Sequence, residues 1–307
     1  MATQVEHLCQ AGAKEADGPL SQQAWSPSSG NVAHVWRHNL DDEVERMASM
    51  AESYPYIALD AQLPGIVAQP TGPFGNYLDY NYQTLKVNVD MTKVLQVGLA
   101  FSNETGDSPT PEEGPSLWRF NFHFDPRRDL ASQDPMELRR KELDRHCTEG
   151  IDPATFAEAL SSSGLVLNED IRWITYSGSK DFHHKAGAGL ASKQEPPWVT
   201  FAGLYDFGHL IKMLTDELLP PQMSGFLENL DMFFPTRCDL AKHANQLSHL
   251  RNYTRQRTFY RKAPHLLQVF FHLPESVRRT AFDPEEEAEE PAEGSAPDAG
   301  SHGLTFQ

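Results

Sequence analysis

The sequence lacks the usual marks of a secreted or membrane protein. Its three cysteines, Cys9, Cys147 and Cys238, form no Cys-x-x-Cys pair, which suits a reducing compartment. No apolar run reaches the ~18 residues that a membrane-spanning helix needs, and the first residues are unlike a signal peptide. These absences predict a soluble, intracellular protein with no membrane partner.

Basic residues are also scarce. The chain has 26 Lys and Arg against 43 Asp and Glu, a net charge of −17. Residues 283–298 hold eight acids and no Lys or Arg, so the rest of the chain still carries −9. An acidic body argues against a broad basic patch and against a sequence-specific DNA partner. It leaves open a nucleic-acid substrate held through divalent metal ions, since the ions then supply the positive charge.

The composition predicts one globular domain with two tails. Hydrophobic residues make up 39% of the 307 residues, enough for one sizeable core. Residues 1–30 show little periodicity, and the acidic segment 281–307 has the composition of a disordered tail. We therefore place the folded domain at 31–280, with a loop-like insertion near 181–197 and a divergent pattern after residue 245.

Strands and helices alternate in a way that predicts a mixed α/β sheet flanked by helices. In the first predicted helix, Asn39 is the expected N-cap, and a buried stripe is spaced three or four residues apart. This stripe consists of Leu40, Val44, Met47 and Met50. Further predicted elements are strands at 56–60, 95–102 and 116–124, a helix at 152–164 ending at Gly164, and an amphipathic helix near 265–273.

The stretch "YIALDAQLPG" at 56–65 suggests a site at the end of a strand. Alternation places Ile57 and Leu59 on one face, and Asp60 and Gln62 on the other. Strand ends often carry the sites of α/β folds. An Asp and a Glu at this spacing would form a good metal site, and Gln is a Glu without its charge.

A second candidate comes from a short duplication. "WITYSGSKDF" at 173–182 and "WVTFAGLYDF" at 198–207 match at six positions, 25 residues apart. Only the second copy leads into a helical pattern, so Asp206 is the better functional candidate of the two Asp residues. An Asp at a helix start is also stabilised by the helix dipole without any function.

Seven segments in one order carry a family resemblance. They are "VWRHNLDDEV", "YPYIALDAQLPGIVAQP", "DYNYQTLKVNVDMTKVLQVGLAFS", "WRFNFHFD", "EGIDPATFAEALSSSGLV", "YDFGHLIKML" and "FFPTRCDL". Together they resemble the CAF-type (Pop-type) catalytic deadenylase of the CCR–NOT complex over residues 31–245. The resemblance implies a ribonuclease H-like fold of the DEDD exonuclease superfamily. It also implies poly(A) RNA as substrate, two Mg²⁺ or Mn²⁺ ions, CCR–NOT-like scaffold subunits as partners, and a location in cytoplasm and nucleus.

The resemblance also implies site residues. Asp60 matches the first Asp of the family motif, and Asp206 matches the second, so both are expected to be catalytic metal ligands. Gln62 stands where the family has a Glu and is either a residual metal ligand or a plain polar residue. The late His-x₄-Asp motif is not intact, and its nearest trace at 297–306 has Pro297 and His302 in place of the His and the Asp.

Two functions remain open. One is a metal-dependent 3′-to-5′ exoribonuclease weakened by the lost groups, which gains support if Asp298 or another acid reaches the site. The other is a binding scaffold of the complex with a retired site. An imperfect gene model is a third explanation for the insertion and the tail.

Several other residues have simpler interpretations. Asp239 is expected to cap a helix, and the pair His183–His184 has no third ligand at metal-binding spacing. The basic, aromatic segment 251–262 suits either RNA stacking or a solvated helix face.

Overall fold

The structure is a computed structural model that describes residues 32–132, 143–176, 202–243 and 262–282. All of them belong to one compact unit. The insertion near 181–197, His183–His184, the trace at 297–306 and residues 1–30 lie outside the described residues. No described helix is long and apolar enough to cross a membrane.

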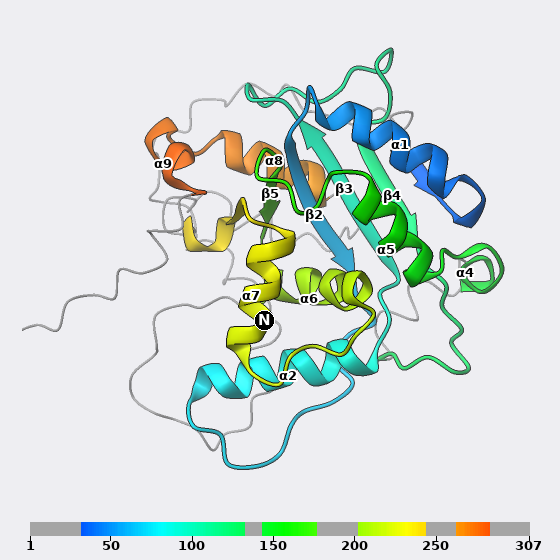
Figure 1. Cartoon of the computed structure of the whole chain (residues 1–307), viewed down its shortest axis with the longest axis vertical. Helices are drawn as coiled ribbons and strands as arrows, with labels where there is room; N and C mark the ends of the chain where they lie inside the picture. Colours follow the sequence, from blue (N-terminus) through cyan, green and yellow to red (C-terminus); the bar gives the residue numbers. More distant parts are fainter. Residues whose placement is uncertain (1–31, 133–142, 177–201, 244–261, 283–307) are drawn as a thin grey trace, which may run out of the picture. The chain divides into compact units, whose positions relative to one another are not determined.

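A six-stranded sheet forms the centre of this unit, in the order β1-β4-β3-β2-β5-β6 (Figure 1). β3 runs antiparallel to β2 and β4, whereas β1 with β4, β2 with β5, and β5 with β6 are parallel pairs. The prediction of a mixed sheet is therefore confirmed. The strands are β1 Val32–Val35, β2 Tyr56–Gln62, β3 Gln96–Ser102, β4 Leu117–Asn121, β5 Arg172–Thr175 and β6 Arg237–Asp239.

Helices flank the sheet, and each predicted helix has a counterpart. The α-helices are α1 Leu40–Ala51, α2 Tyr77–Met91, α4 Leu143–Glu149, α5 Pro153–Ser162, α6 Ala202–Thr215, α7 Met223–Phe233, α8 Lys262–Phe271 and α9 Glu275–Thr280. The described residues also form two 3-10 helices: η1 Arg37–Asn39 directly precedes α1, and η3 Leu240–His243 directly follows β6.

Helix α1 confirms its predicted stripe and corrects its predicted cap. The four stripe residues are all buried against the sheet. The Asn39 side chain, however, makes no cap bond to α1. It accepts a hydrogen bond from the Trp36 backbone N–H at 2.8 Å, because η1 comes first and makes Asn39 the third residue of that turn.

Helix α5 follows its sequence signals at both ends. The Asp152 side chain accepts hydrogen bonds from the backbone N–H groups of Ala154 and Thr155, as an N-cap should. Beyond the C-terminal end, Gly164 has a φ of +74°, a left-handed conformation that glycine adopts without strain. The predicted stop at Gly164 is confirmed.

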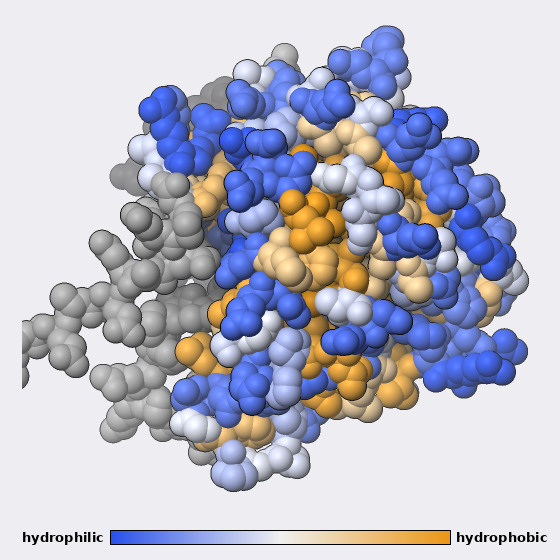
Figure 2. All heavy atoms as spheres, in the orientation of Figure 1, coloured by the Kyte–Doolittle hydropathy of each residue, from blue (hydrophilic) through white to orange (hydrophobic). Residues whose placement is uncertain are grey.

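The two faces of the sheet differ in what covers them. One face packs apolar side chains such as Leu59, Phe101 and Trp118 in the large core that includes α1, α5 and α6. The other face presents small residues, including Ala58 and Ala100, to α8. Figure 2 shows the first of these faces, where the outer side of α1 is hydrophilic and apolar residues gather toward the middle.

Helix α8 confirms the amphipathic helix predicted near 265–273, and α9 follows it. Phe270 of α8 packs with Tyr56 of β2 and with Phe282, at ring-centroid distances of 5.8 and 5.4 Å. Packing against the sheet therefore continues to Phe282, two residues beyond the predicted domain boundary.

Candidate functional site

The candidate site lies at the C-terminal end of β2. Ile57 and Leu59 are buried in the large core, whereas Ala58 packs on the α8 face, so the predicted alternation is confirmed. Asp60 and Gln62 follow on that same α8 face and are both partly buried. The strand thus uses one face for the core and the end of the other face for polar groups.

Gln62 has an unusual environment for a carboxamide. Its Oε1 atom is buried and accepts no hydrogen bond within the described part of the chain. The next side chains of the same row are paired: Gln96 Nε2 donates to Asn121 Oδ1 at 2.6 Å, and Asn121 Nδ2 donates to the Val35 carbonyl at 2.9 Å. A buried acceptor without a partner costs about 1–3 kcal/mol. Such an atom suits a position where a cation would be its partner.

Asp206 lies on helix α6, which packs against β2 (Figure 1). It is only 8% exposed and lies between Tyr205 and Phe207, both buried in the large core. The prediction that Asp206 stands at a helix start is wrong: α6 begins at Ala202, and its first turn holds no acidic residue. The helix dipole is therefore a weaker explanation for a buried Asp in the second turn.

The loop after β2 is held by a buried asparagine that the sequence analysis missed. Asn88 of α2 accepts hydrogen bonds from the backbone N–H groups of Val67 and Ala68 at 2.7 and 2.9 Å. Its Nδ2 donates to the Ala68 carbonyl at 2.8 Å. The signal was present, since a polar residue within an apolar helical stripe requires partners.

A lysine ties α6 to α2. Lys212 Nζ donates to three backbone carbonyls at the end of α2, those of Val89, Asp90 and Thr92, at 2.8, 2.9 and 3.1 Å. Burial lowers the pKa of Lys212, and the nearby Asp90 opposes this shift. These bonds satisfy carbonyls that a helix end leaves open and fix the helix that carries Asp206.

One turn before Lys212, His209 is held neutral. Its side chain is buried, and burial lowers its pKa to about 3, with a smaller effect from the charge of Lys212. At neutral pH the imidazole therefore adds no charge to the helix that carries Asp206.

The side-chain oxygens of Asp60, Gln62 and Asp206 are of the hard type that Mg²⁺ or Mn²⁺ prefers. Their shared role as metal ligands stays a prediction, and Gln62 has a neutral oxygen where the family resemblance implies a Glu. Within the described ranges, no group of three or more His, Cys, Asp or Glu side chains could hold a metal ion.

Two other sequence candidates do not enlarge this set. Asp239 is the last residue of β6 and directly precedes η3, and its capping role stays a prediction. Asp298 lies outside the described residues.

The mixed sheet and its flanking helices define an α/β domain with polar side chains at the end of the central strand β2. Residues 35–158 match the model of the CAF1 family ribonuclease. The protein named probable CCR4-associated factor 1 homolog 7 of Arabidopsis thaliana is 35% identical over 218 residues, or 69% of this chain and 70% of that protein. The chain belongs to the CAF1 family of ribonucleases.

Two further similarities agree with this membership. The poly(A) ribonuclease pop2 of Schizosaccharomyces pombe is 35% identical over 212 residues, or 68% of this chain and 55% of that protein. The solved structure of S. pombe Pop2p in its Mg²⁺- and Mn²⁺-bound form superimposes with a TM-score of 0.65 at 30% identity. That match covers 82% of this chain and 94% of the Pop2p chain.

Proposed function

We propose that this protein is a poly(A)-specific 3′-to-5′ exoribonuclease that uses Mg²⁺ or Mn²⁺ and works within a CCR–NOT-like assembly. Family membership supports the reaction, and a relative named as a poly(A) ribonuclease supports the substrate. The metal-bound Pop2p structure supports the cofactor, and a relative named as a CCR4-associated factor supports the assembly. The observation that carries the proposal is the buried, unpaired Gln62 Oε1 beside Asp60.

Each residue of the site has a defined task. The Asp60 and Asp206 carboxylates hold the cation, and Gln62 adds a neutral oxygen. A bound pair of divalent ions supplies charge stabilisation for the attacking and leaving oxygens of a phosphoryl displacement. Because Gln62 brings no negative charge, the site holds the cation less tightly than one with a Glu.

We expect turnover to be slower than in a family member with all its charged groups. Electrostatic stabilisation and general-base catalysis each commonly contribute about 10²–10⁴-fold. The carboxamide at Gln62, together with the missing Asp and the missing general base of the late motif, therefore predicts a decrease of several orders of magnitude.

The activity test uses a 5′-labelled RNA ending in twenty adenosines, with Mg²⁺, Mn²⁺ or EDTA. Shortening that needs the metal and is abolished in Asp60→Ala is the expected result. Asp170→Ala, a change of the same type at an exposed position, is the matched control and should behave as wild type. Metal-independent shortening, or equal rates in Asp60→Ala and wild type, would contradict the proposal.

A second readout does not depend on catalysis. Titration calorimetry with Mn²⁺ should show binding by the wild type, tighter binding by Gln62→Glu, and no binding by Asp60→Ala. Wild-type heats that match those of Asp60→Ala would show that these residues hold no metal.

A binding scaffold within the same complex is the second candidate function. It is favoured because, in the described part of the chain, no group of three or more His, Cys, Asp or Glu side chains could hold a metal ion. If the wild type does not shorten the RNA and Gln62→Glu restores no activity, while the protein co-purifies with a NOT-type scaffold subunit, the scaffold function holds.

A further inference from the structure

A row of side chains crosses four strands and leads away from Asp60. Asp60 of β2 is paired with Gly98 of β3, Gly98 with Arg119 of β4, and Arg119 with His34 of β1. Directly paired residues project from the same face of a sheet. The row therefore runs on the α8 face, from the candidate metal site to the edge strand.

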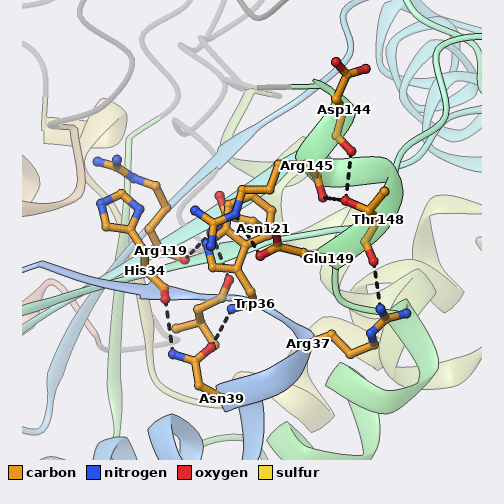
Figure 3. Close-up of polar contacts among 11 residues, drawn as sticks. His34, Trp36, Arg37, Asn39, Arg119, Asn121, Asp144, Arg145, Thr148 and Glu149 are labelled. Carbon is orange, nitrogen blue, oxygen red and sulfur yellow. Dashed lines mark hydrogen bonds and ion pairs between the residues drawn. The ribbon is translucent and has the colours of Figure 1, made fainter. Parts of the chain in front are cut away.

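The far end of the row carries an imidazole and a guanidinium at the surface. His34 is exposed and Arg119 is partly exposed. Figure 3 shows the His34 ring and the Arg119 side chain extending side by side from neighbouring strands. The Arg119 guanidinium carries a positive charge, and the His34 imidazole adds a ring that can donate or accept a hydrogen bond.

No side chain projects from the middle of the row, because the residue there is Gly98. A Cβ placed there would lie 3.5 Å from the Asp60 carbonyl oxygen and 3.9 Å from Leu117 Cδ1, which are ordinary contacts. The absence of a side chain at Gly98 therefore leaves a shallow space between the Asp60 carboxylate and the Arg119 guanidinium. The backbone conformation at this position does not itself require a glycine.

The separation of the strands gives the distances from Asp60 to Arg119 and His34. Neighbouring strands lie about 4.8 Å apart, so the Arg119 and His34 backbones stand roughly 10 and 14 Å from that of Asp60. An arginine side chain presents a planar set of donors that matches a phosphate group. This distance brings the Arg119 guanidinium and the His34 imidazole within reach of phosphates a few nucleotides from the candidate metal site.

We propose that Arg119 and His34 form a subsite for the RNA backbone, binding phosphates on the 5′ side of the scissile bond as the strand crosses over Gly98. The inference rests on the proposed function for the position of the 3′ end at Asp60. The subsite recognises the phosphodiester and not the base, so it contributes to affinity without selecting adenosine.

The test measures fluorescein-labelled A20 and U20 RNA binding by anisotropy in EDTA, over a series of salt concentrations. Each phosphate contact on single-stranded nucleic acid adds about −0.7 to the slope of log K against log salt. Arg119→Gln should therefore make the slope less negative by about 0.7. It should also weaken the binding of both RNAs about tenfold at low salt. Arg119→Lys should keep the slope, since it keeps the charge.

Two control positions make the result specific. Arg46 lies on α1 over the opposite face, so Arg46→Gln should bind as wild type. Gly98→Ala should fold and bind normally, whereas Gly98→Leu should obstruct the row and weaken binding as much as Arg119→Gln. His34→Gln should cause a smaller loss in the same direction. An unchanged slope in Arg119→Gln, or wild-type binding by Gly98→Leu with an intact melting transition, would overturn the subsite.

Failure of the subsite and failure of the proposed function are distinguishable. Metal-dependent shortening with unaltered RNA binding in Arg119→Gln would refute the subsite and leave the function standing. A reduced salt slope in Arg119→Gln, together with no shortening by any variant, would keep the subsite and refute the enzyme. If the wild type binds neither RNA at low salt, the subsite is refuted, and the shortening assay with metal decides the function.

Discussion

Gln62→Glu should make the stability of this protein depend on divalent metal. Residues 60 and 62 project from the same face of β2, about 6.6 Å apart along the strand. Two carboxylates at that distance repel by about 2.5 kcal/mol at an effective dielectric constant of ~20. In EDTA at neutral pH, we therefore expect a loss of about 2 kcal/mol, or roughly 4–8 °C in Tm for a domain of this size.

Divalent ions should reverse that loss. A cation between the two carboxylates removes their repulsion, and binding to the folded state alone adds stability by mass action. Millimolar Mn²⁺ should thus raise the Tm of Gln62→Glu well above its value in EDTA and more than it raises that of wild type. The repulsion raises the pKa of the introduced carboxyl, so the penalty is absent well below pH ~4.3 and develops as the pH rises.

The control removes the carboxamide without adding charge. Gln62→Met deletes a buried acceptor that has no partner, so it should be neutral or more stable than wild type by about 1 kcal/mol. Scanning calorimetry in EDTA and in Mn²⁺ measures all three proteins. An Mn²⁺ response of Gln62→Glu no larger than that of Gln62→Met would refute the metal site at the end of β2.

Three other perturbations test the framework around the site. His209 has a folded pKa of about 3 against ~6.5 when unfolded, so wild type should lose about 1.4 kcal/mol per pH unit below 6.5. Urea unfolding at pH 7 and pH 5 should show this slope, and His209→Gln should remove it. Lys212→Met leaves three carbonyls at the end of α2 without their donor and should lower the free energy of unfolding by about 2 kcal/mol or more. An unchanged urea midpoint would contradict a stabilising role of Lys212 between α6 and α2. Asp152→Ala removes the α5 cap and should cost about 1 kcal/mol, which the same urea titration measures, with Asp152→Asn expected to retain most of the stability.

Local patterns predicted three of the strands (β2, β3 and β4) and four of the helices (α1, α5, α6 and α8), because each of these follows the periodicity of its own residues. Alternation along β2 correctly separated Leu59 from Asp60, and the spacing of apolar residues identified the buried side of α1. The same kind of reasoning was wrong at Asn39, because a turn of three residues before α1 offered its side chain a nearer donor. It was also wrong for the position of Asp206, because α6 begins four residues earlier.

Local sequence patterns did not predict the hydrogen bonds that support the site, because these bonds join segments that are far apart in the chain. Lys212 contacts carbonyls about 120 positions earlier in the chain, and Asn88 binds a loop 20 residues before it. Sequence periodicity carries no information on such pairings. The His34–Arg119 neighbourhood depends on the parallel pairing of β1 with β4, which strand patterns alone do not specify.

Strand β2 has its apolar core residues on one face and its polar site residues on the other, and this arrangement has an evolutionary consequence. Ile57 and Leu59 hold the strand in the large core, while Asp60 and Gln62 lie on the opposite face, which Ala58 shares. Substitutions of Asp60 or Gln62 therefore leave the apolar packing of Ile57 and Leu59 in place. A duplicated copy could exchange a carboxylate for a carboxamide without first passing through an unfolded form. The same architecture permits the reverse exchange, so catalytic strength in this family can rise or fall while the scaffold persists.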